Sequence, residues 1–163
     1  MTAFTATDEY GSFMPNPTYE AKYGRGPHVS VDAFVEWRGQ ILLIRRQDGT
    51  WALPGGFVDP GEQLLDAAIR ELTEETTINM SPADLRIAYR DPTVVFSDPT
   101  RDPRSHIITH VHRFELPAKI EVEVRAADDA KEAAWFTDVG PLEFYADHRQ
   151  IVSAMESGAS AAS

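Results

Sequence analysis

The chain has 163 residues, a length that suits one domain of ordinary size. Hydrophobic residues make up 42% and aromatic residues 10%, which is enough to form a core and excludes a fully disordered chain. The formal net charge of -11 repels nucleic acid phosphates, and because no run of Lys and Arg offsets it, we expect no nucleic acid partner. The absence of cysteine excludes disulfides, thiolate zinc sites and thiol catalysis.

The sequence also lacks signals for a membrane or for export. No apolar stretch approaches the roughly 18 residues that cross a bilayer. The N-terminal segment MTAFTATDEYGSF lacks the basic region and the apolar run of a secretory signal. We therefore expect a cytoplasmic protein without a membrane partner.

The two ends differ in composition from the rest of the chain. Residues 1–26 carry aromatic side chains among Gly and Pro without a period, which predicts an irregular N-terminal arm. Two interpretations of this arm stay open: a flexible tail, or a segment that packs on the domain or on a partner subunit. Residues 157–163 (SGASAAS) are of low complexity and predict a disordered tail. The domain itself is expected over residues 27–156.

Two strands are predicted after the arm. The segment HVSVDAFVEW (residues 28–37) has the alternation of a half-buried strand, with apolar residues at Val29, Val31, Ala33 and Val35. A more buried strand is predicted at QILLIRR (residues 40–46). The following segment WALPGGFVDPGEQ (residues 51–63) contains two prolines and three glycines, which predict a loop.

The segment LLDAAIRELTEET (residues 64–76) predicts a helix. An apolar stripe at helical spacing runs through Leu65, Ala68, Ile69 and Leu72. Good helix formers dominate, and neither Gly nor Pro interrupts the segment. The segment NMSPAD (residues 79–84) is expected to end it.

The second half of the chain predicts mainly strands and then a closing helix. The strands are expected at LRIAYR (85–90), TVVF (93–96), HIITHVHRFEL (106–116), KIEVEVR (119–125) and EAAWFT (132–137). The helix is expected at PLEFYADHRQIVSAMES (141–157). Strands on both sides of a central helix indicate a single layered α/β domain.

Three glutamates mark the predicted central helix. Glu71, Glu74 and Glu75 stand at i, i+3 and i+4, so their carboxylates share one helix face. One interpretation is a solvated acidic face. The other is a site for a hard cation such as Mg²⁺, which prefers oxygen ligands. No lysine lies among these glutamates, and the glycine-rich loop upstream allows backbone to approach a ligand closely, which favours a cation site.

The same residues carry a specific resemblance. The Nudix box reads Gly, five residues, Glu, seven residues, Arg-Glu, an aliphatic residue, any residue, Glu-Glu, any residue, Gly and an aliphatic residue. This chain matches every fixed position but one, with Gly56, Glu62, Arg70, Glu71, Leu72, Glu74, Glu75 and Ile78. Thr77 replaces the usual Gly that follows the helix, where a left-handed cap is common. The chain therefore resembles the Nudix hydrolase family over this box and the flanking WALPGGFV.

The resemblance implies a fold, a metal and roles for residues. The fold would be the Nudix α/β/α sandwich with a central mixed sheet. Glu71, Glu74 and Glu75 would bind Mg²⁺, for which Mn²⁺ can substitute, together with the backbone carbonyl of Gly55. Glu62 and Arg70 would form an ion pair that fixes the loop on the helix.

The implied reaction is hydrolysis of a pyrophosphate bond in a nucleoside diphosphate derivative. Metal ions neutralise the phosphate oxygens and lower the pKa of water, and a carboxylate takes up the proton. The candidates for this base are a box glutamate, Asp128, Asp129 and Glu132, and the sequence does not choose among them.

A second resemblance suggests the substrate. The segment VVFSDPTRDPRSHIITHVHRFEL is similar to a segment of the ADP-ribose pyrophosphatase branch, with matches at Pro99, Arg101, Arg104, Ile108, Thr109 and His110. The segments ADDAKEAAWF and FYADHRQIV resemble the Nudix domain associated with nicotinamide mononucleotide adenylyltransferase. These likenesses imply hydrolysis of ADP-ribose to AMP and ribose 5-phosphate.

Three arginines are the candidate substrate-binding residues. The guanidinium groups of Arg101 and Arg104 suit a phosphate or the ribose, and Arg46 at the end of a strand suits a phosphate. The alternative is an ordinary surface loop with Arg–Asp pairs for the first two, and a surface arginine for Arg46.

Competing functions stay open at this stage. One is a Nudix hydrolase for a nucleoside triphosphate, a dinucleoside polyphosphate or a capped RNA. Another is an ADP-ribose sensor without catalysis, but such domains join a DNA-binding domain, and no winged-helix segment follows this one. By analogy with the ADP-ribose branch, we expect a homodimer.

Overall fold

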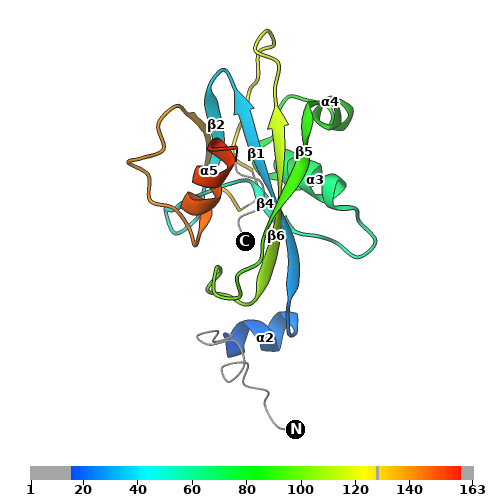
Figure 1. Cartoon of the computed structure of the whole chain (residues 1–163), viewed down its shortest axis with the longest axis vertical. Coiled ribbons are helices and arrows are strands. Elements are labelled where there is room, and N and C mark those ends of the chain that lie inside the picture. Colours follow the sequence, from blue (N-terminus) through cyan, green and yellow to red (C-terminus); the bar gives the residue numbers. More distant parts are fainter. Residues whose placement is uncertain (1–15, 128, 159–163) are drawn as a thin grey trace.

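The computed structural model describes residues 16–127 and 129–158, and these residues form a mixed sheet with helices on both faces (Figure 1). The strands are β1 (His28–Trp37), β2 (Gln40–Arg45), β3 (Trp51–Ala52), β4 (Gly55–Phe57), β5 (Tyr89–Phe96), β6 (Ile107–Glu115) and β7 (Glu132–Phe136). The helices are α2 (Pro17–Tyr23), α3 (Leu64–Thr76), α4 (Pro82–Ala88) and α5 (His148–Glu156). None of these helices is long and apolar enough to cross a membrane.

Strand β1 organises the 7-stranded sheet. One edge pairs in parallel with β6 along nine residues, from His28↔Ile107 to Glu36↔Glu115. The other edge is shared by two antiparallel partners, since β2 pairs at Glu36 and Trp37, and β4 pairs at residues 30–32. Strand β4 takes the place of β2 beside residues 30–32 of β1, and the residues of β4 line both cavities described below. The single parallel pair makes the sheet mixed, as expected.

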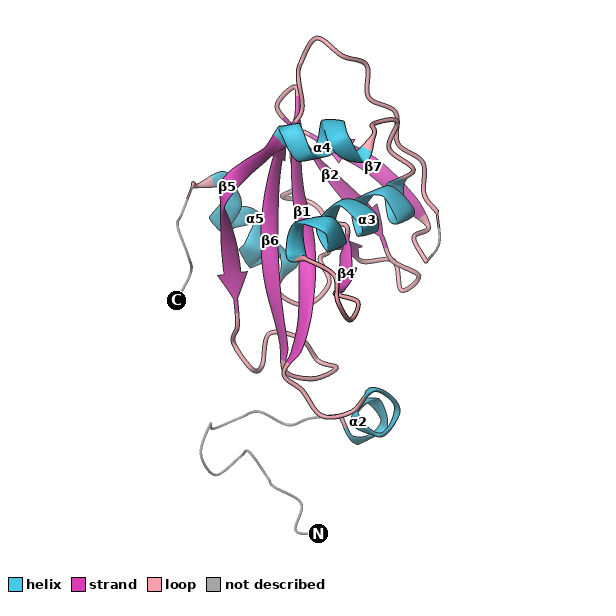
Figure 2. Ribbon diagram, turned by 90° about the vertical axis from the view of Figure 1, so that its right-hand side faces the viewer, coloured by secondary structure: helices cyan, strands magenta, loops and turns pink. Residues whose placement is uncertain are grey.

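The alternation in β1 predicted a strand buried on one face, but residues 30–35 are buried on both faces, and Val29 is exposed. Val31, Ala33 and Val35 pack on the face covered by α3 and α4, whereas Phe34 packs on the opposite face with α5. Figure 2 shows α3 and α4 in front of the sheet and α5 behind it. The apolar stripe of α3 is buried at Ala68, Ile69 and Leu72, because only that side of the helix meets the sheet.

The prediction of a strand at residues 85–90 is wrong, because α4 occupies Pro82–Ala88 and β5 begins only at Tyr89. The Ser81 side chain caps this helix by accepting a hydrogen bond from the Asp84 backbone N–H at 3.1 Å. Pro82 stands in the first turn, where its missing N–H costs nothing. Ser-Pro-x-Asp is a helix start signal in the sequence, and it outweighs the strand-like composition that follows.

The prediction of a strand at residues 119–125 is wrong, although the alternating apolar side chains of this segment face the core. Val122 is buried, and Ile120 and Val124 pack on the core beside α3. The segment does not join the sheet, because the end of α3 offers it hydrogen-bond partners instead. The backbone N–H of Arg125 donates to the carbonyl of Thr76 at 2.7 Å, and that of Ala127 donates to the carbonyl of Glu75 at 3.1 Å.

Thr77, which replaces the usual box glycine, ends α3 in the left-handed conformation, with φ at 43° and ψ at 36°. A Cβ makes this conformation costly for Thr. Its hydroxyl donates to the carbonyl of Arg125 at 2.9 Å, which ties the helix end to the neighbouring segment. The helix therefore keeps the predicted bounds without the glycine.

Three boundaries differ from the sequence predictions. The closing helix begins at His148 rather than at residue 141, and short strands interrupt the loop predicted at residues 51–63. Part of the N-terminal arm is helical, since α2 begins at a cap in which Asn16 accepts from two backbone N–H groups. Residues 1–15 of the arm and residues 159–163 of the tail lie outside the described residues.

Candidate active site

The box glutamates of α3 lie beside the backbone of β4. Glu71 and Glu75 line a cavity of about 590 Å³, together with Gly55, Gly56, Arg46 and Arg104. Glu74 is not among the lining residues and is about half exposed, with its carboxylate 3.2 Å from Arg70. The three carboxylates therefore share one helix turn but not one environment.

Arg70 connects the helix to the preceding loop. Its guanidinium binds both carboxylate oxygens of Glu62, at 2.8 and 2.9 Å, and donates to the carbonyl of Phe57 at 3.0 Å. The Arg70 guanidinium holds the pKa of Glu62 below its usual value. The ion pair expected between these two residues is present, and it fixes the loop between β4 and α3.

Two glycines allow the carboxylates to reach β4. A Cβ at Gly55 would lie 2.3 Å from the carbonyl oxygen of Val31, and a Cβ at Gly56 would lie 2.5 Å from a carboxylate oxygen of Glu71. The backbone N–H of Gly55 donates to Glu75 at 3.0 Å. A side chain at Gly55 would separate β4 from β1, and a side chain at Gly56 would displace the carboxylate of Glu71.

Burial changes the acidity of the two cavity-lining glutamates. It raises the pKa of Glu75 to about 8 and raises the pKa of Glu71 above its usual value. The charged forms of both are therefore costly in the absence of a cation. A positive ion in this cavity would offset that cost.

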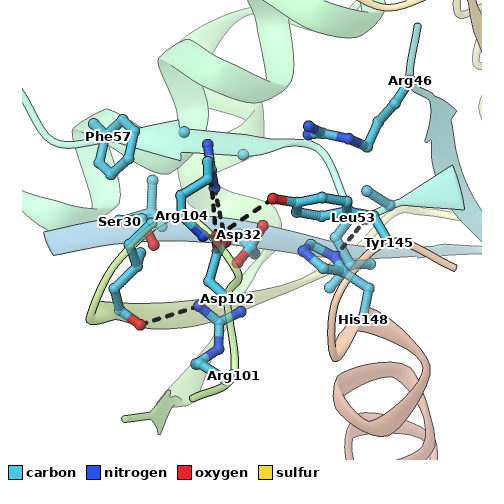
Figure 3. A pocket seen from close by; sticks show the side chains of 15 residues that line it. Ser30, Asp32, Arg46, Leu53, Phe57, Arg101, Asp102, Arg104, Tyr145 and His148 are labelled. Atoms are coloured by element: carbon cyan, nitrogen blue, oxygen red, sulfur yellow. Dashed lines mark hydrogen bonds and ion pairs between the residues drawn. The ribbon is translucent and has the colours of Figure 1, made fainter. Parts of the chain in front are cut away.

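A second, smaller cavity of about 70 Å³ lies on the α5 side of β4. It shares Gly55, Gly56, Phe57, Arg46 and Arg104 with the larger cavity. Figure 3 shows Arg46, Arg104 and Tyr145 converging at this shared boundary. A ligand that extends from one cavity to the other would pass these two arginines.

The three predicted arginines differ in how their donors are used. Arg101 is buried and bonds Asp147 through two nitrogens, at 2.8 Å each, and the carbonyl of Ile107 through the third, at 3.1 Å. Arg104 bonds both carboxylate oxygens of Asp102, at 2.9 and 2.8 Å. The guanidinium of Arg46 makes no hydrogen bond to any residue that the structure describes.

Comparison with known proteins assigns the family. The sequence model of the NUDIX domain matches residues 26–154. The chain belongs to the Nudix family. It is 40% identical, over 77% of its length and 71% of the relative's, to an ADP-ribose pyrophosphatase from Methanocaldococcus jannaschii.

Solved structures agree with this assignment. The Nudix chain superposes with a TM-score of 0.76 and 34% identity on a bifunctional NMN adenylyltransferase/ADP ribose pyrophosphatase from Francisella tularensis, complexed with AMP and a manganese ion. The match covers 86% of this chain but only 44% of the bifunctional one. The NUDIX domain of Shewanella oneidensis NrtR shares the fold, with a TM-score of 0.62 at 23% identity, over 89% of this chain and 99% of that one.

The Nudix family is metal-dependent, and the donors of this site fit a hard divalent cation. Glu71 and Glu75 present carboxylates to the cavity from one side, and Gly55 adds backbone. No group of three or more His, Cys, Asp or Glu side chains converges as a metal cluster among the described residues. Glu71 and Glu74 both bond Arg70, at 2.7 and 3.2 Å, so a site of three carboxylates would require both side chains to leave this arginine.

The candidates for the general base differ in their position relative to the larger cavity. Asp129 lines the larger cavity with Glu71 and Glu75. Glu132 lies on β7 and faces Arg45 at 3.9 Å, outside the cavity lining. Asp128 lies outside the described residues.

Apart from the three predicted arginines, sequence reasoning missed the polar residues of the smaller cavity. Asp32 is buried on β1 and accepts a hydrogen bond from the Thr109 hydroxyl, and burial raises its pKa to about 7. An acid between apolar residues of a strand was the available signal for Asp32. Asp102 had the nearby Arg104 as a signal, whereas Tyr145 carried none, because its partners Trp51 and Asp102 are distant in the sequence.

The buried His148 ring predicts how the stability of the fold depends on pH. Its Nδ1 accepts a hydrogen bond from the backbone N–H of Leu53 at 3.0 Å, and burial lowers its pKa to about 3. As the pH falls, this imidazole takes up a proton near pH 6.5 in the unfolded chain, and only at lower pH in the folded chain. The stability contributed by the neutral ring is therefore present above about pH 6.5 and is lost as the pH falls towards the folded pKa.

We expect this histidine to steepen the acid dependence of stability. Urea unfolding of the wild type is compared with that of His148→Asn, which keeps an acceptor for Leu53. Between about pH 6 and pH 4, the wild type should lose up to about 1.4 kcal/mol per pH unit more than the variant. Parallel slopes for the two proteins would contradict the assignment of a neutral buried ring.

Proposed function

We propose that this protein is a Mg²⁺-dependent Nudix hydrolase that splits ADP-ribose into AMP and ribose 5-phosphate. The observation that carries the proposal is the larger cavity, which Glu71 and Glu75 line together with Arg46 and Arg104. A cation site thus adjoins a site for anionic oxygens, as a bound diphosphate requires. The ADP-ribose activity named for the relatives supports the choice of substrate.

In this proposal each group of residues at the site has its own role in the reaction. When bound, Mg²⁺ supplies neutralisation of the diphosphate charge and a lower pKa for water. Glu71, Glu74 and Glu75 would hold the cation with the Gly55 carbonyl, once Glu71 and Glu74 give up their contacts with Arg70. Arg46 and Arg104 orient the diphosphate, while Glu62 and Arg70 hold the β4–α3 loop in place. Asp129 or a box glutamate takes the proton from the attacking water.

Arg101 has a different part in this proposal from that of the other two arginines. Its nitrogens are engaged by Asp147 and Ile107, and its side chain is almost fully buried. Arg101 therefore fastens the loop between β5 and β6 to the start of α5. Its effect on the substrate is exerted through the position of Arg104 in the same loop.

The test is a substrate panel with identified products. Purified protein with ADP-ribose and Mg²⁺ should yield AMP and ribose 5-phosphate, and excess EDTA should abolish turnover until Mg²⁺ or Mn²⁺ is restored. A nucleoside triphosphate, a dinucleoside polyphosphate and a capped RNA serve as competing substrates. Slow hydrolysis of ADP-ribose beside brisk hydrolysis of another member would reject this substrate.

Binding without turnover is the other informative outcome. An ADP-ribose sensor would bind the ligand in calorimetry and release no AMP in the presence of either metal. The domain limits of 27–156, the homodimer and the cytoplasmic location stay predictions. Sedimentation of the purified chain tests the homodimer.

A further inference from the structure

Arg46 lines both cavities, and no residue within the described part of the chain holds its guanidinium by a hydrogen bond. Its Nε is buried and has no hydrogen-bond partner among the described residues. The nearest carboxylate oxygen belongs to Asp48, 4.0 Å from Nε. A long side chain with this freedom would lose conformational entropy on binding an anion, unless something else holds it.

The ring of Tyr145 supplies that support. The guanidinium carbon of Arg46 lies 3.8 Å from the centre of the ring, well within the range of a cation–π contact. Stacking engages the flat face of the guanidinium and leaves its N–H groups, which lie in the plane, available to an anion. Tyr145 thus holds Arg46 without consuming its donors.

Tyr145 is itself held by contacts at both ends. Its backbone N–H donates to the carbonyl of Trp51 at 2.9 Å, and its hydroxyl donates to Asp102 at 3.3 Å. Asp102 also binds Arg104, whose guanidinium carbon lies 5.7 Å from the Tyr145 ring centre. Figure 3 shows the hydroxyl of Tyr145 directed at Asp102 and the guanidinium of Arg46 beside the ring. One tyrosine therefore contacts both cavity arginines.

We propose that Tyr145 is a positioning residue for the diphosphate, which acts by stacking on Arg46 and keeping its N–H groups directed into the cavity. This inference rests on the proposed function for the identity of the anion. The ring makes the energetic contribution, and the hydroxyl secures the ring through Asp102. Preorganisation of this kind lowers the entropy cost of binding and appears in KM more than in kcat.

The test is a double-mutant cycle on ADP-ribose hydrolysis. Tyr145→Phe keeps the ring, and Tyr145→Leu removes it while also lacking the hydroxyl. With Arg46 present, KM for Tyr145→Leu should exceed that for Tyr145→Phe by about 5- to 20-fold, the value of a partly buried cation–π contact. With Arg46→Met added to both, the two values of KM should agree within about twofold.

The cycle separates positioning from general damage to the fold. A merely structural role would leave the ratio between the two position-145 variants unchanged when Arg46 is replaced. An unchanged ratio, or no difference with Arg46 present, would overturn the proposal. Phe144→Leu is the matched control, because this neighbouring aromatic stacks on Arg149 at 5.0 Å and should leave KM at the wild-type value.

A second measurement distinguishes this inference from the proposed function. If the wild type does not hydrolyse ADP-ribose, the proposed substrate fails, and the same cycle is then measured as Kd for inorganic pyrophosphate with Mg²⁺ in calorimetry. The loss of the ring effect in the Arg46→Met background would still support the role of Tyr145. A wild-type protein that binds no pyrophosphate would overturn that role as well.

Discussion

Replacement of Glu75 by glutamine is expected to lower kcat for ADP-ribose by about 100-fold or more while the fold is kept, the usual scale for loss of a key electrostatic group. Glutamine preserves the shape and still accepts the hydrogen bond from the backbone N–H of Gly55. It removes the negative charge that the cavity offers to a cation. The measurement is kcat at saturating Mg²⁺, with circular dichroism to establish folding.

The control for this variant lies on the same helix. Asp66→Asn makes the same chemical change at the first turn of α3, where Asp66 is partly exposed and paired with Arg86. Its kcat should stay within about twofold of the wild type, since exposed ion pairs contribute little. A Glu75→Gln enzyme with a nearly wild-type rate would show that the metal assignment is wrong.

Alanine substitutions at the two adjacent glycines of β4 are expected to differ in effect: one should lower the activity, and the other should lower the stability. In Gly56→Ala the new methyl group meets the carboxylate of Glu71 rather than backbone, so kcat/KM should fall by about 10- to 100-fold with little change in stability. In Gly55→Ala the methyl group meets the backbone of β1 at Val31, which cannot move aside. That variant should lose about 1–3 kcal/mol of unfolding free energy, as overpacked sites do.

Urea unfolding and steady-state kinetics on both variants provide the measurement. Gly140→Ala is the matched control, because that methyl group would approach only an exposed Asp138 side chain, at 3.1 Å. Equal stability losses in the two β4 variants would contradict the expectation that backbone beside Gly55 yields less readily than the Glu71 side chain beside Gly56. An unimpaired Gly56→Ala enzyme would mean that the position of Glu71 is not critical.

The helices and strands that the sequence predicts correctly are those whose residue pattern lies within the segment itself. The bounds of α3 were predicted as observed, because an uninterrupted apolar stripe and good helix formers define Leu64–Thr76. Strand β1 was recovered from its alternation. Residues 119–125 show the opposite case, since their alternation was genuine but the carbonyls at the end of α3 took the place of a strand partner.

In the candidate site, too, the sequence predicted the contacts between nearby residues and not those between distant ones. The family assignment from the box is confirmed, and the Glu62–Arg70 pair is present, eight residues apart on one loop and helix. The smaller cavity was not foreseen. Its polar contacts join Asp32 to Thr109 and Tyr145 to Asp102, over 77 and 43 residues of chain.

The sequence by itself determined the family, the central helix and the presence of three carboxylates on one of its faces. The tertiary structure decided which of those carboxylates reach a cavity and which arginine makes no hydrogen bond to the described residues. The physical reason is that periodicity and spacing act within a helix or strand, whereas a hydrogen-bond partner is chosen by packing. Arg46 and Tyr145 lie far apart in the chain, and only the fold brings ring and guanidinium to 3.8 Å.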